Sequence, residues 1–127
     1  MNGFFLVALG GAIGAAGRYG AGLAATRLLP GAWPWGTFFV NVTGSFAMGL
    51  VVGWLALKGA DSGQGTKLFL ATGVLGGFTT FSAFSLEVVE MLRDDAMARA
   101  AGYAGASVGV GVAALFLGLW IARRMFA

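Results

Sequence analysis

Apolar residues occupy this chain in four long runs that are separated by short polar segments. The runs cover residues of about 3–26, 35–57, 68–92 and 100–122. A helix needs about 20 mostly apolar residues to cross a bilayer core of about 30 Å, so each run predicts one membrane-spanning helix. The short connections leave no segment for a second domain. We therefore expect residues 1–127 to form a single all-α transmembrane domain.

The composition supports a membrane protein and excludes several kinds of chemistry. Hydrophobic residues make up 58% of the chain and charged residues only 10%, whereas a soluble domain carries about a quarter charged residues. Cysteine and histidine are absent, which excludes disulfides, thiolate metal sites and imidazole acid–base catalysis. No carboxylate pair or nucleophile–base set indicates an enzyme. The net charge of +3 suits anionic lipid headgroups and does not indicate nucleic-acid binding.

Positive residues are almost equally divided between the two sides of the predicted bundle. The side with both termini carries four and the other carries three, with Arg18 nearer the second side. The residues are Lys58, Lys67, Arg123 and Arg124 against Arg27, Arg93 and Arg99. The positive-inside rule therefore predicts no single orientation. Either another feature sets the orientation, or both orientations are inserted and two copies pair antiparallel.

The third run contains a predicted weak point in its helix. Gly76 and Gly77 are followed by Thr79 and Thr80. Each glycine lowers helix stability by about 1 kcal/mol relative to alanine. A break within residues 76–80 would free backbone carbonyls in the middle of the membrane, where such carbonyls can coordinate a cation.

Phe78, Phe81 and Phe84 follow each other at intervals of three residues in the same run. Such a stripe usually indicates lipid contact or core packing. The alternative interpretation uses the ring edges, which carry partial positive charge and can face an anion without trapping it. Both interpretations stay open on the stripe alone.

Several polar residues lie at membrane depth, where each is a functional candidate. Thr37, Asn41 and Ser45 fall on one face of the second run, where they could form interhelical hydrogen bonds or line an ion pathway. Ser107 lies one turn after Tyr103 on the fourth run. For Ser107 alone, a bond to the carbonyl four residues earlier is the favoured interpretation.

The charged residues inside the runs receive no catalytic role. Arg18 could snorkel toward the interface, anchor its helix end or draw anions to a vestibule. Glu87 and Glu90 could pair with Arg18 or Arg93, or lie in the interface. The 23 glycines favour tight helix packing, which leaves little room for a pore within one subunit. A pore formed with a second subunit is the preferred interpretation.

Three blocks of this sequence resemble the Fluc or CrcB family of small fluoride channels. They are GGAIGAAGRY at residues 10–19, GTFFVNVTGSFAMG at 36–49 and GVLGGFTTFSAFSLEVV at 73–89. They keep the order and spacing of the family, and with the fourth run the resemblance covers nearly the whole chain. The most specific part is the GG-x-TTFS-x-F pattern.

The resemblance implies an antiparallel, dual-topology homodimer with two fluoride pores at the subunit interface. It also implies a structural sodium ion held by the main-chain carbonyls of Gly76 and Thr79. The candidate pore residues are Thr37, Asn41, Phe81, Phe84, Tyr103 and Ser107. Two positions depart from the family pattern. Gly111 stands where a hydroxyl would continue the polar track one turn after Ser107, and Phe78 stands where leucine is commoner.

The sequence therefore predicts a fluoride-selective channel of the inner membrane that exports cytoplasmic fluoride passively. One alternative is a small multidrug-type exporter, which would need a membrane-embedded carboxylate and finds none in the first run. Another is a non-transporting membrane scaffold, which would explain the glycines but not the polar residues at mid-depth.

Overall fold

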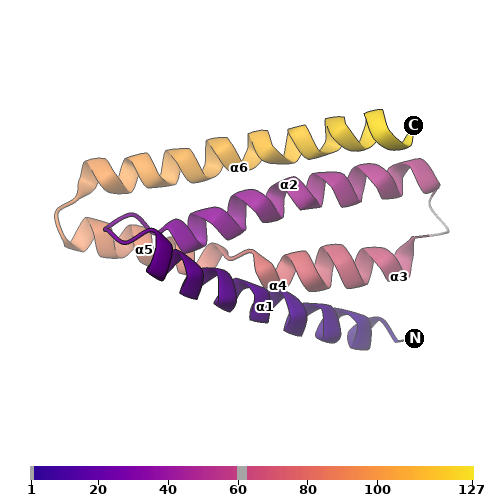
Figure 1. The fold of residues 1–127 in the computed structure, drawn as a ribbon, viewed down its shortest axis with the longest axis horizontal. Coiled ribbons are helices and arrows are strands. Elements are labelled where there is room, and N and C mark those ends of the chain that lie inside the picture. Colours follow the sequence, from indigo (N-terminus) through magenta and orange to yellow (C-terminus); the bar gives the residue numbers. More distant parts are fainter. Residues whose placement is uncertain (1, 60–62) are drawn as a thin grey trace.

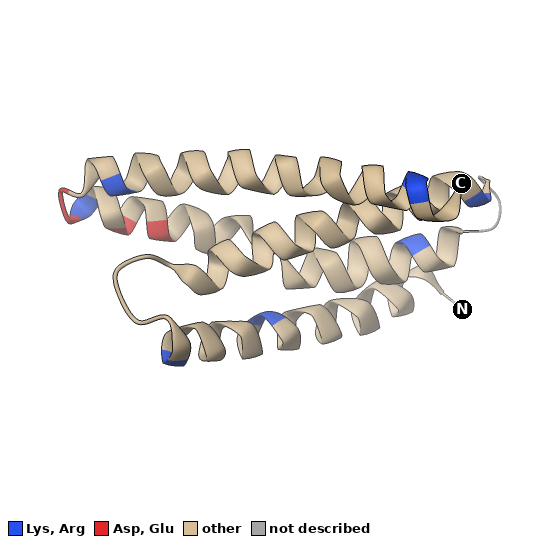
Figure 2. Cartoon of the chain, turned by 45° about the horizontal axis from the view of Figure 1, so that its top comes forward, with Lys and Arg blue, Asp and Glu red and all other residues tan. Residues whose placement is uncertain are grey.

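The computed structural model describes residues 2–59 and 63–127, and these form helices without any strand (Figure 1). Four helical stretches are long and apolar enough to cross a membrane: Gly3–Leu28, Trp35–Lys58, Gln64–Arg93 and Met97–Phe126. The prediction of an all-α protein with four crossings is confirmed. Both termini lie at the same end of the bundle, and charged residues gather toward its two ends (Figures 1 and 2).

The first, second and fourth crossings are continuous helices. They are α1 (Gly3–Leu28), α2 (Trp35–Lys58) and α6 (Met97–Phe126). Asn2 caps α1 by accepting a hydrogen bond from the Phe4 amide at 2.8 Å. In the link between α1 and α2, Gly31 has φ of 138°, a conformation that side chains rarely adopt.

The third crossing is irregular and consists of four pieces. These are α3 (Gln64–Thr66), the π-helix η1 (Lys67–Leu75), α4 (Gly76–Phe78) and α5 (Phe81–Arg93). Thr79 and Thr80 between α4 and α5 are extended, with ψ of 160° and 122°. The predicted break is present, but it lies at the threonines, because Gly76 keeps helical angles of −63° and −37°. The π-helix before it was not predicted from the sequence.

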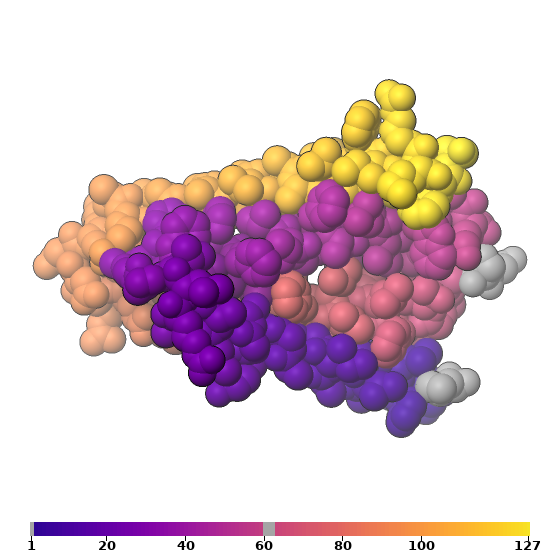
Figure 3. Space-filling model, viewed as in Figure 1, coloured from indigo at the N-terminus to yellow at the C-terminus, as the bar shows by residue number. Residues whose placement is uncertain are grey.

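Glycines set the spacing between α2 and α6, which lie side by side (Figures 1 and 3). A Cβ atom added at Gly49 would overlap the Leu115 carbonyl oxygen, and one at Gly118 would overlap that of Phe46. The two backbones are thus in direct contact, as small residues permit in membrane helices.

A second glycine seam joins α1 to the third crossing. A Cβ atom at Gly10 would lie 2.5 Å from the Phe69 carbonyl oxygen, and one at Gly77 would lie 2.6 Å from that of Gly11. Gly14 meets the backbone of Val74 in the same way. This seam holds α1 against the segment that precedes the break.

A cluster of buried side chains lies near the turn between α5 and α6. It contains the buried residues Met91, Ala100 and Tyr103, with Phe84 and Trp33 packed against them. Most other large apolar side chains are exposed, such as Phe4 and Phe116, as helices facing lipid or another subunit require.

Candidate functional site

Local side chains end the helix on each side of the break in the third crossing. On the first side, the amide and the hydroxyl of Thr79 both donate to the Leu75 carbonyl, at 3.0 and 2.9 Å. On the second side, the Thr80 hydroxyl accepts from the Ala83 amide at 3.2 Å and caps α5. The run of two threonines is therefore suited to ending one helix and starting the next.

Asn41 on α2 replaces the helical bonds that Thr80 lost. Its Nδ2 donates to the Thr80 carbonyl at 2.9 Å, and its Oδ1 accepts from the Thr80 amide at 2.7 Å. From the sequence alone, both an interhelical bond and a pathway role were open for Asn41. The bond to the break is present, and one N–H of the amide group stays available for another acceptor.

Arg18 on α1 also binds the backbone at the break. Its Nε donates to the Gly77 carbonyl at 3.1 Å, and in the described part of the chain it has no carboxylate partner. In a continuous helix, this carbonyl would accept from the Phe81 amide. The guanidinium thus anchors α1 to the broken helix, since charged groups at membrane depth commonly pair with backbone carbonyls.

The carbonyl oxygens of Gly76, Phe78 and Thr79 at the break have no hydrogen bond among the described residues. Leaving such groups unpaired away from water is costly. Neutral carbonyls at unwound helices are the ligands that hold sodium in transporters, so Gly76 and Thr79, the pair that the resemblance implies, have suitable chemistry for a sodium ion. Gly76 is exposed in the single subunit, which leaves its side of the break open to further ligands.

Glu87 joins three crossings, although the sequence analysis gave it no role. Its Oε1 accepts from the Thr37 hydroxyl and its Oε2 from the Tyr103 hydroxyl, both at 2.6 Å. Of the two alternatives left open for Glu87, pairing with Arg18 or Arg93 is not seen among the described residues, where both carboxylate oxygens accept from hydroxyls. One signal was present in the sequence: Glu87 follows Phe84 by three residues and so shares its helix face.

Two adjoining hollows lead from the α1–α2 link toward the break. The outer hollow, of about 450 Å³, is lined by Trp33, Thr37 and Glu87 among others. The inner one, of about 500 Å³, is lined by Arg18, Thr37 and Thr80 among others. Thr37 lines both hollows, so the cluster of Thr37, Glu87 and Tyr103 lies where the two hollows adjoin.

Aromatic rings form a row beside this cluster. The Phe81 and Phe84 ring centroids lie 5.7 Å apart, and those of Phe84 and Tyr103 lie 5.2 Å apart. Phe81 is 78% exposed, whereas Tyr103 is fully buried. Phe78 lies outside the row, because its ring packs near Gly17 and Gly44. The row therefore contains two of the three phenylalanines of the stripe.

Ser107 lies one turn after Tyr103 on α6. Its hydroxyl oxygen is buried and has no hydrogen-bond partner in the described part of the chain. The favoured interpretation, a bond to the carbonyl four residues earlier, is therefore wrong. A buried hydroxyl that makes no bond within its subunit remains free to donate to a ligand.

The sequence profile of the family described as CrcB-like protein, Camphor Resistance (CrcB), matches residues 5–119. The chain belongs to the CrcB family. This CrcB-family chain is 68% identical over 127 residues to the fluoride-specific ion channel FluC of Hyphomonas neptunium, with all of both chains covered. It is 50% identical over 127 residues to the fluoride-specific ion channel FluC of Caulobacter vibrioides, again with full coverage. It is 54% identical over 120 residues to FluC of a Chelativorans species, covering 94% of this chain and 95% of the relative.

The three blocks that carry the resemblance are the segments that meet at the break. Residues 10–19 contain Arg18, residues 36–49 contain Thr37 and Asn41, and residues 73–89 contain the break and the ring pair. The CrcB-family motifs of this chain thus correspond to one connected set of polar contacts rather than to three separate sites.

Proposed function

We propose that the chain is the subunit of a fluoride-selective channel that lets cytoplasmic fluoride leave passively across the plasma membrane. The observation that carries the proposal is the polar break beside a row of aromatic rings and hydroxyls at membrane depth. The relatives named as fluoride-specific ion channels, at up to 68% identity, support it.

Fluoride is small and strongly hydrated, so a pore has to replace its water with other donors. The ring edges of Phe81 and Phe84, the Ser107 hydroxyl and the remaining Asn41 N–H are neutral donors of that kind. Neutral donors bind an anion without holding it strongly, which conduction requires. The Thr37 and Tyr103 hydroxyls donate to Glu87, so they would reach an anion only by turning from the carboxylate.

The proposed assembly is an antiparallel, dual-topology homodimer. Phe81 is 78% exposed in the single subunit, which suits a ring that meets a second copy. Gly76 at the break is exposed as well. The near-equal distribution of lysine and arginine on the two sides suits insertion in both orientations. Two copies related by a two-fold axis would then form two pores along their interface.

The proposed cation is a structural sodium ion bound by the carbonyls of Gly76 and Thr79. A sodium ion would satisfy two oxygens that otherwise lack partners, and a second copy would supply the same two. Asn41 and Arg18 hold the backbone on either side of these carbonyls. The ion would thus stabilise the dimer rather than travel with fluoride.

Ion efflux from liposomes tests this function. Purified protein should release fluoride rapidly and chloride negligibly with sodium present, and lose activity when sodium is removed. Phe81→Ile and Phe84→Ile channels should conduct fluoride poorly, because aliphatic side chains offer no ring edge. Normal conduction by both variants would remove the aromatic assignment.

Because of Glu87, the efflux experiment should also be run with an imposed pH gradient. A proton-coupled exporter also needs a carboxylate at membrane depth, and Glu87 is half-buried in the third crossing. Passive release that ignores an imposed pH gradient supports the channel. Absence of fluoride release from folded dimers, with uptake of an organic cation driven by the gradient, would establish the exporter instead.

A further inference from the structure

Hydroxyl side chains in the crossings differ in what they bind. Thr26, Thr43 and Ser85 donate to the carbonyl four residues earlier in their own helices, at 2.9, 2.6 and 2.9 Å. This bond uses their only proton. Ser45 and Ser107 make no hydrogen bond in the described part of the chain. Their protons are therefore available to a ligand.

Ser45 lies in the middle of α2, one turn after Asn41 and on the same face. Both residues line a hollow of about 330 Å³ on this side of the subunit. Thr79, Thr80 and Phe81 line the same hollow, so it reaches from the break to the first ring of the aromatic row. A ligand that has passed Phe81 would therefore meet the Ser45 hydroxyl.

The neighbouring face of α6 lacks a polar side chain at the level of Ser45. Tyr103 and Ser107 are one turn apart, but Gly111 interrupts the row at the next turn. A Cβ atom built at Gly111 would lie 3.8 Å from the Ser45 Oγ. The Ser45 hydroxyl thus occupies the region that a hydroxyl from position 111 would reach.

From this geometry, we propose that Ser45 is an anion-binding residue of the pore and supplies from α2 the hydroxyl that α6 lacks after Ser107. The ligand is a small, strongly hydrated anion, which receives a hydrogen bond from Ser45 in the hollow that this residue shares with Asn41 and Phe81. The inference rests on the proposed channel function. It adds Ser45 to the candidate pore residues Asn41, Phe81 and Phe84.

The first variant is Ser45→Ala, measured by fluoride efflux from liposomes with sodium present. Loss of one hydrogen bond to a charged ligand should slow efflux about tenfold, which corresponds to about 1.4 kcal/mol. Thr43→Val is the matched control, because it removes a hydroxyl two residues away whose proton is already used. The control should conduct as the wild type does.

The decisive variant moves the hydroxyl from α2 to α6. Ser45→Ala combined with Gly111→Ser should recover most of the efflux, since a Cβ atom at position 111 makes only ordinary contact. Ser45→Ala with Gly111→Ala adds the same carbon without a hydroxyl and should stay slow. Equal rates for the two double variants would overturn the proposal, because volume rather than the hydroxyl would then explain the result.

The outcomes for Ser45 and for the channel itself are separable. If the wild type releases no fluoride, the proposed function fails and the Ser45 proposal fails with it. If the wild type conducts and Ser45→Ala conducts equally well, only the Ser45 proposal fails. Each variant is first checked for dimer elution and thermal unfolding. Should Ser45→Ala not fold, Ser45→Cys keeps the volume with a weaker donor and should conduct at an intermediate rate.

Discussion

Glycine seams join two pairs of crossings, and the two seams lead to different structures. Between α2 and α6, Gly49 and Gly118 bring two continuous helices into backbone contact. Between α1 and the third crossing, Gly10 and Gly14 bring the backbones equally close, but the helix breaks shortly afterwards at Thr79. Close packing occurs in both places, so it does not by itself mark a functional region.

The difference between the seams lies in how the backbone groups are satisfied. In α2 and α6, each helix supplies its own hydrogen bonds, and the contact needs only small residues. At the break, side chains from other crossings supply them: Asn41 to Thr80 and Arg18 to Gly77. Breaking a helix in a membrane is costly unless protein groups replace the lost bonds. The polar residues around the break are thus the distinguishing feature of the second seam.

The largest expected effect comes from placing a side chain between the α2 and α6 backbones. Gly118→Ala should leave little folded protein, because the added carbon would overlap the Phe46 carbonyl and force the two helix backbones apart. Size-exclusion elution and thermal unfolding in detergent measure this. Gly102→Ala on the same helix is the control, since a Cβ atom there meets nothing within 4 Å. A fully stable Gly118→Ala protein would contradict the seam.

The next effect concerns the link between α2 and the break. Asn41→Ala removes both hydrogen bonds to Thr80 and leaves two backbone groups unpaired, at about 1–3 kcal/mol each. We expect folded protein with strongly reduced fluoride efflux and weaker stabilisation by sodium. Thr26→Val removes a self-bonded hydroxyl and should leave both unchanged. Wild-type efflux from Asn41→Ala would show that α2 does not hold the break.

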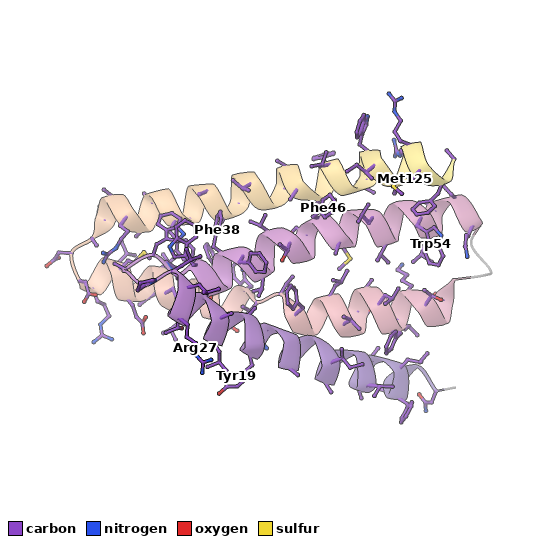
Figure 4. The ribbon with its side chains drawn as sticks, in the orientation of Figure 1. Tyr19, Arg27, Phe38, Phe46, Trp54 and Met125 are labelled. Carbon is purple, nitrogen blue, oxygen red and sulfur yellow. The ribbon has the colours of Figure 1, made fainter. Side chains whose placement is uncertain are left out.

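A substitution at Arg18 should have a smaller effect, and the direction of the change in sodium dependence is informative. Because its Nε binds the Gly77 carbonyl, Arg18→Met should raise the sodium concentration that half-stabilises the dimer about tenfold, through loss of a charge-assisted bond. Arg27→Met is the control, because Arg27 extends away from the bundle (Figure 4). If Arg18→Met needs less sodium for half-stabilisation, repulsion between the guanidinium and sodium outweighs the role of Arg18 in positioning the Gly77 backbone.

The smallest effect is expected at Glu87. Glu87→Gln keeps the shape but leaves one oxygen to accept from both Thr37 and Tyr103, so stability should fall by about 1–2 kcal/mol. Chemical unfolding in detergent measures the change. Glu90→Gln removes an exposed carboxylate one turn away and should have no effect. Equal stability of the two variants would mean that the Glu87 bonds contribute little.

Much of the fold could be predicted because its signals are local. Four apolar runs of bilayer length predicted the crossings, and the glycines followed by threonines predicted the break. The motif pattern at residues 73–89 predicted the family. Each of these follows from residues that are near neighbours in the chain, where helix propensity and transfer to lipid act directly.

The partners of the polar residues could not be predicted in this way. Asn41 and Thr80 are 39 residues apart, Thr37 and Glu87 are 50 apart, and Arg18 and Gly77 are 59 apart. The two partners considered for Arg18 from the sequence were the carboxylates Glu87 and Glu90, whereas its partner is the Gly77 backbone carbonyl. The sequence also favoured a hydrogen bond from Ser107 to the carbonyl four residues earlier, whereas its hydroxyl has no partner in the described chain.

The sequence by itself determined that this chain crosses the membrane four times, belongs among small CrcB-type proteins and weakens its third helix near Gly76. Only the tertiary structure decided which polar groups are used and which stay free. Asn41 and Arg18 are committed to the backbone, while Ser45, Ser107 and the carbonyls of Gly76 and Thr79 make no bond in the described subunit. The physical reason is that a hydrogen bond depends on distance and direction between groups far apart in sequence, which close helix packing alone establishes.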